Sequence, residues 1–182
     1  AELFTGNNLL VMAWVHRRIP GRLVLKNFVV IYLANLVGAV GLALLVYLSG
    51  NLRMNDGAVE GTAVAIAKAK VALPFMEAFF RGILCNILVC LAVWLASAGR
   101  QVVNRVLAVI FPITAFVACG FEHCVANMYF IPLGLMIDGG DLSIIGGLAK
   151  NLVPVTLGNL VGGAGMVGLV YYVIYRRKEK VA

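Results

Sequence analysis

Long apolar blocks, separated by short polar or turn-forming segments, dominate the pattern of this chain. Each of the four clearest blocks holds at least 23 residues, and a helix needs about 20 mostly apolar residues to cross a bilayer. A shorter apolar run lies near the N-terminus. We therefore predict an all-α membrane protein that forms one domain over 1–182, with a partial span at 1–15 and spans at 27–49, 71–97, 106–137 and 152–175.

Composition supports the membrane prediction. Hydrophobic residues make up 62% of the 182 residues, charged residues 13%, and the mean hydropathy is +0.97. Soluble domains contain about 45–50% apolar and about 25% charged residues. The chain has too little polar surface for that class, so the lipid bilayer is its expected environment.

Basic residues are distributed unevenly between alternate loops. Ten of the 15 Lys and Arg residues lie in 16–26, 99–105 and the tail after Tyr175, with Glu179 as the acidic residue among them. Cytoplasmic loops carry the excess of Lys and Arg, so these segments and the C-terminus are expected to be cytoplasmic. Topology thereby accounts for the net charge of +7, and we expect no nucleic-acid partner.

An internal repeat links the two halves of the chain. The pattern K-N-x7-N-L-V-G occurs at 26–38 and again at 150–162, an offset of 124 residues. Three predicted crossings separate the copies, so they run in opposite directions. An odd number of spans per repeat gives an inverted repeat, an arrangement typical of transporters. We expect three plus three spans, of which about one and a half would precede residue 1.

Two corresponding segments interrupt the predicted spans. The block 106–137 contains Gly120-Phe121-Glu122-His123, and its counterpart is the polar and glycine-containing segment 1–8. Irregular backbone at membrane depth survives only where it is buried in protein or lines a water-filled cavity. Matched breaks in two inverted repeats therefore predict the place of a solute pathway.

His123 is the candidate for chemistry within that pathway. Ionisable groups inside a membrane are costly and usually face a cavity or a partner, although packing alone is the alternative. Imidazole titrates near pH 6.5 in water, so His123 could stabilise an anion or protonate it. We expect the adjacent Glu122 to accept backbone N–H groups at a helix start, where the dipole favours negative charge, with a proton relay as the alternative.

Several other side chains could contribute. Asn86 and Thr5 could donate hydrogen bonds to a dehydrated solute or bond to a neighbouring helix. Phe116, and Leu3 with Phe4, could form apolar constrictions that gate by dewetting. Lys70 at the mouth of a span could attract anions or extend to the interface.

Other classes of protein lack support in the sequence. There is no Asn-Pro-Ala pair, no Gly-x-Ser-Gly motif and no Walker motif. A single deep histidine makes a haem-binding anchor subunit a weak alternative, and the four cysteines have no CxxC spacing. We expect no cofactor, no metal and no enzymatic activity.

Three segments resemble the formate/nitrite transporter family. They are Ala1-Glu2-Leu3-Phe4-Thr5, Gly120-Phe121-Glu122-His123-Cys124-Val125-Ala126-Asn127-Met128, and Asn151-Leu152-Val153-Pro154-Val155-Thr156-Leu157-Gly158-Asn159. The resemblance implies an aquaporin-like six-helix protomer with its own pore, a homopentamer, and a place in a bacterial or archaeal inner membrane. It also implies a small monovalent anion as the partner.

The resemblance assigns roles to matching positions. It places Leu3, Phe4 and Thr5 in the loop of the cytoplasmic constriction, and Phe116 and Val89 at the periplasmic one. It places Thr5, Asn86 and His123 in the central chamber and Lys70 in the vestibule. Glu122 and Asn127, from the same motif as His123, complete the predicted pathway residues.

The expected function is a channel or transporter for small monovalent anions such as formate, nitrite or hydrosulfide. His123 would act as its electrostatic or proton-coupled gate. The alternative is a passive pore for small neutral solutes, in which His123 only packs.

Overall fold

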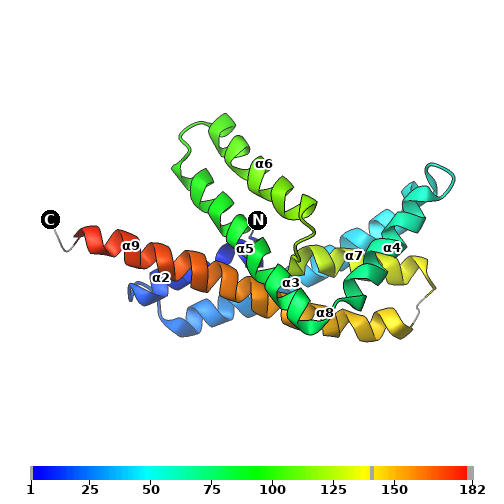
Figure 1. Ribbon diagram of the computed structural model, residues 1–182, viewed down its shortest axis with the longest axis horizontal. Coiled ribbons are helices and arrows are strands. Elements are labelled where there is room, and N and C mark those ends of the chain that lie inside the picture. Colours follow the sequence, from blue (N-terminus) through cyan, green and yellow to red (C-terminus); the bar gives the residue numbers. More distant parts are fainter. Residues whose placement is uncertain (1, 140–141, 180–182) are drawn as a thin grey trace.

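The computed structural model describes residues 2–139 and 142–179, and within these ranges the chain is helical and contains no strand (Figure 1). Three helical stretches are long and apolar enough to cross a membrane: Gly21–Leu48 (α3), Phe75–Ala98 (α5) and Gly146–Tyr175. The last stretch lies within three consecutive elements, α8 (Leu142–Leu160), a π-helical segment η2 (Val161–Leu169) and α9 (Val170–Glu179). Figure 1 shows it as one continuous rod.

The predicted interruption of the block 106–137 separates two helices. The helix α6 (Val102–Ala118) ends before Cys119, and α7 (Cys124–Ile137) begins after His123. Gly120 has a φ of +66°, a left-handed conformation that costs glycine little and often follows a helix end. In the first half, the short helices α1 (Phe4–Asn7) and α2 (Leu10–Val15) precede α3.

The segment after α3 differs from the short polar connection expected between the predicted spans 27–49 and 71–97. It forms a 3₁₀ turn η1 (Asn51–Arg53) and a helix α4 (Ala58–Ala72) that contacts α7. Alternating alanines, which have the highest helix propensity, explain the helix. Its small face permits close contact, since a Cβ on Gly134 would overlap the side chain of Ala67. The expected start of the span 71–97 therefore falls inside α4, and Pro74 precedes α5.

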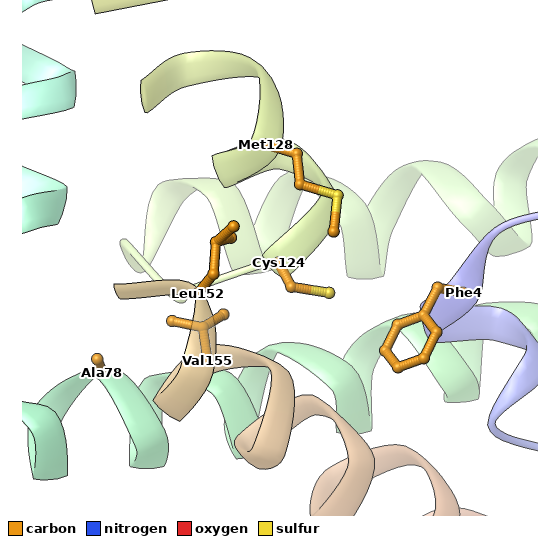
Figure 2. Packing of buried hydrophobic residues seen from close by; sticks show 6 residues of the cluster. All are labelled: Phe4, Ala78, Cys124, Met128, Leu152 and Val155. Atoms are coloured by element: carbon orange, nitrogen blue, oxygen red, sulfur yellow. The ribbon is translucent and has the colours of Figure 1, made fainter. Parts of the chain in front are cut away.

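The two repeats meet at a shared core. The Tyr32 hydroxyl on α3 lies 3.1 Å from the Thr156 hydroxyl on α8, and these residues are 124 positions apart, the offset of the repeated motif. A residue can contact its own counterpart only near the axis that relates the repeats. Beside this pair lies the buried cluster of Figure 2, made of Phe4, Ala78, Cys124, Met128, Leu152 and Val155.

Candidate functional site

His123 lies immediately before α7 and serves as its N-cap. The backbone N–H of Ala126 donates to His123 Nδ1 at 3.1 Å. Because Nδ1 accepts, the neutral imidazole carries its hydrogen on Nε2. That nitrogen lies 2.9 Å from Thr5 Oγ1, so Nε2–H donates to the threonine hydroxyl. This bond joins the two breaks across the centre of the molecule.

An apolar cavity of about 500 Å³ lies against His123. Leu3, Val89 and Phe116 border it together with residues of α3, α6 and α7, among which Asn35 and Tyr129 are polar. The Phe116 ring stacks on the imidazole with centroids 5.7 Å apart and an interplanar angle of 19°. The structure thus brings four of the predicted pathway residues to one cavity, three apolar and one titratable.

Thr5 and Asn86 lie behind that cavity and are fully buried. Asn86 Nδ2 donates to the carbonyl oxygens of Asn159 at 2.6 Å and of Thr5 at 3.3 Å. Asn86 Oδ1 has no hydrogen-bond partner within the described residues. The amide therefore holds helices together through its donor, while its acceptor stays unpaired.

Phe4 packs into the core and is 3% exposed. Its ring makes edge contacts with Phe28 and Tyr32 at centroid distances of 5.7 Å and 5.1 Å. The structure therefore places Phe4 beside the axis between the repeats, whereas its neighbours Leu3 and Thr5 lie at the cavity and on His123.

Glu122 and Lys70 form a largely buried ion pair. Lys70 Nζ donates to Glu122 Oε1 at 3.0 Å, with side-chain exposures of 16% and 5%. Asn127 Nδ2 donates to Glu122 Oε2 at 2.6 Å and to Asn151 Oδ1 at 2.7 Å. The expected partners of Glu122, backbone N–H groups, are thus replaced by a lysine and side-chain amides. The Lys70 ammonium also lies 5.8 Å from the Phe130 ring, a favourable cation–π distance.

Sequence reasoning missed the contribution of the repeated asparagines. Asn151 and Asn159 are buried, and Asn159 bonds to both sides of the second break. The signal was present in the motif K-N-x7-N-L-V-G, which served only to reveal the repeat. Because polar side chains inside apolar spans are costly, asparagines at the same position of both repeats could have been predicted to bind a buried polar group.

Fold and site together define a helical membrane protein of two inverted repeats, whose breaks meet at an apolar cavity with one histidine. The chain belongs to the formate/nitrite transporter family, since the model described as "Formate/nitrite transporter" matches residues 1–173. This confirms the resemblance seen in the sequence and the predicted fold class.

The formate channel FocA of Haemophilus influenzae is 40% identical over 186 residues, covering 93% of this chain and 66% of that protein. The formate channel FocA of Escherichia coli strain K12 is 38% identical over 196 residues, covering 98% and 69%. A solved structure described as a pentameric formate channel with formate bound has a TM-score of 0.81 at 33% identity, covering 96% of this chain and 75% of that one.

The chain spans about two thirds of the length of these curated relatives. The relatives are named as channels, in agreement with the prediction of a protein that is not an enzyme.

Proposed function

We propose that this chain is a transmembrane channel for small monovalent anions such as formate, nitrite or hydrosulfide, with His123 as its gate. The observation that carries the proposal is the position of His123, whose imidazole borders a largely apolar cavity together with the polar residues Asn35 and Tyr129. An anion entering such a cavity loses hydrogen bonds to water, and only polar groups of the lining can replace them. The few polar groups there, His123 among them, govern which solutes can pass.

The surroundings of His123 favour an anion over a cation. The imidazole caps the N-terminus of α7, and the macrodipole of a helix places partial positive charge at that end. Glu122, the adjacent carboxylate, is compensated by Lys70, so its negative charge does not oppose an arriving anion. Phe116 and Leu3 supply apolar walls that exclude water.

The hydrogen bonds of His123 have different consequences for proton-coupled gating and for electrostatic gating. In the neutral form, Nε2–H donates to Thr5 and Nδ1 accepts from Ala126. A second proton would occupy Nδ1 and face the N–H of Ala126, donor against donor. Proton-coupled gating therefore requires the start of α7 to rearrange, whereas electrostatic gating by the neutral ring does not.

The assembly and orientation follow from similarity and charge. The formate channel of similar structure is described as pentameric, and we infer a homopentamer in which each protomer has its own pore. The basic segments 16–26 and 99–105 support a cytoplasmic C-terminus by the positive-inside rule. A bacterial or archaeal inner membrane is the inferred location.

The test is flux in liposomes. The full-length protein is reconstituted, and formate, nitrite and hydrosulfide fluxes are measured from pH 5 to pH 8, with His123→Ala in parallel. A preference for one anion and a pH dependence that the variant loses would support the proposal. Unchanged anion flux in His123→Ala would remove the gating role. Glycerol or water permeation without anion flux would instead favour the neutral pore.

A further inference from the structure

Asn35 on α3 and Asn159 on α8 occupy the same position of the repeated motif and make the same pair of bonds. Asn35 Oδ1 accepts the backbone N–H of Phe4 at 2.9 Å, and its Nδ2 donates to the carbonyl of Glu2 at 3.1 Å. Asn159 Oδ1 accepts the N–H of Cys124 at 2.9 Å, and its Nδ2 donates to the carbonyl of Glu122 at 3.0 Å. Each amide therefore clamps a three-residue stretch of one break.

The residue inside each clamp is a pathway residue. Leu3 lies between Glu2 and Phe4, and His123 lies between Glu122 and Cys124. Their backbones are nearly identical, with φ and ψ of −116° and 126° for Leu3 and −114° and 116° for His123. Both border the cavity of about 500 Å³. The clamps thus present two structurally equivalent side chains to one space, one apolar and one titratable.

The equivalence extends to the acid of each break. In the first break, Asn7 Nδ2 donates to Glu2 Oε2 at 2.7 Å and to Asn27 Oδ1 at 3.0 Å. In the second, Asn127 makes the same two bonds to Glu122 and Asn151. Four polar positions per repeat therefore keep their partners through the inversion, although the intervening residues differ. The same hydrogen bonds at both breaks indicate that these residues stabilise the two breaks in the same way.

We propose that Asn35 and Asn159 are symmetry-related positioning residues, which hold Leu3 and His123 at the anion pathway. The inference rests on the proposed anion-channel function. Asn159 acts on the titratable gate, so its loss changes how flux depends on pH. Asn35 holds the apolar Leu3 and itself borders the cavity, so its loss changes the size of the flux and leaves its pH dependence as in the wild type.

The control lies on the same two helices. Tyr32→Phe removes the hydroxyl bond between α3 and α8 and leaves both clamps intact. It therefore matches the Asn variants in removing a polar contact between the repeats, but it should leave flux and its pH dependence unchanged. Asn159 Nδ2 also donates to the Gly82 carbonyl at 2.8 Å, so a purely structural role would make Asn159→Ala the least stable variant but would leave the pH dependence of its flux unchanged.

The experiment compares wild type, Asn35→Ala, Asn159→Ala and Tyr32→Phe in liposomes, with formate as the probe anion. We expect Asn159→Ala to change the ratio of flux at pH 5 to flux at pH 8 by about fivefold or more, the effect of losing more than one buried hydrogen bond. Asn35→Ala should change total flux without changing that ratio. A wild-type ratio in Asn159→Ala, or equal changes in both Asn variants, overturns the proposal.

A second readout does not depend on transport. Hydrogen exchange should show protected Phe4 and Cys124 amides in the wild type, with Phe4 losing protection in Asn35→Ala and Cys124 in Asn159→Ala. Fast exchange at both amides in the wild type overturns the proposal even if Asn159→Ala does not assemble. If the wild type carries no anion but both amides are protected, the proposed function fails and the clamps themselves stand.

Discussion

Close packing of α5 against α8 depends on Gly158, and adding one methyl group there should destabilise the protein. A Cβ at Gly158 would overlap the carbonyl oxygen of Phe79 and lie 3.0 Å from the Ile83 nitrogen and 3.1 Å from the Gly82 Cα. Ordinary contacts to a Cβ begin at 3.4 Å. All three neighbours are backbone atoms of α5, so no side chain can rotate away and the helices must separate.

The expected magnitude follows from two opposing terms. Overpacking costs about 1–3 kcal/mol, and a rigid backbone neighbour puts Gly158→Ala at the upper end. Alanine gains about 1 kcal/mol over glycine in a helix. The net result is a loss of about 2 kcal/mol in the free energy of unfolding. Gly165, seven residues further along the same rod, has nothing within 4 Å of its Cβ position, so Gly165→Ala keeps only the favourable term.

The assay is thermal unfolding of the purified protein in detergent, followed by loss of helical signal or of assembly. Stability differences of about 1 kcal/mol shift the Tm by roughly 2–4 °C in proteins of this size. The two variants should therefore differ by about 6–12 °C, with Gly158→Ala below the wild type. Equal Tm values for Gly158→Ala and Gly165→Ala would refute the close packing of α5 on α8.

Three further perturbations test the site. Lys70→Met leaves the buried Glu122 carboxylate without its cation and should cost about 3–5 kcal/mol in unfolding free energy. The double variant with Glu122→Gln should recover most of that loss. Equal Tm values for the single and double variants would contradict the ion pair. Thr5→Val removes the acceptor of His123 Nε2–H and should cost about 1–3 kcal/mol, whereas Thr5→Ser should retain wild-type stability in the same melts. Cys119 is exposed while the other three cysteines are buried, so maleimide in detergent should modify Cys119 first, as mass spectrometry of peptides would show.

The lengths of the apolar blocks and the spacing of the repeated motif were enough to predict the repeat and the place of its breaks. The apolar blocks are long, and the matched asparagines of the motif gave the offset directly. His123 could be selected because a titratable side chain inside a membrane span is costly and usually faces a cavity or a partner. These features are local in sequence or repeated along it, so they need no knowledge of how helices pack.

Partners across the molecule could not be predicted in the same way. The bond from His123 to Thr5 spans 118 positions, and that from Lys70 to Glu122 spans 52. Helix α4 was missed because Glu60, Lys68 and Lys70 make its sequence look like a polar connection. Alanine propensity and close contact with Gly134 outweigh those charges in the folded protein.

The two repeats divide structural and chemical tasks in a way that follows from membrane physics. Each repeat must break a helix to open a pathway, and each break leaves backbone groups that lipid cannot satisfy. Asn35 and Asn159 satisfy those groups by the same bonds, so this part of the structure is conserved between the repeats. The side chains inside the two clamps differ: Leu3 is apolar, whereas His123 Nδ1 also accepts the N–H of Ala126 at the start of α7. The two clamps, alike in their bonds, thereby present one apolar side chain and one histidine to the same largely apolar cavity.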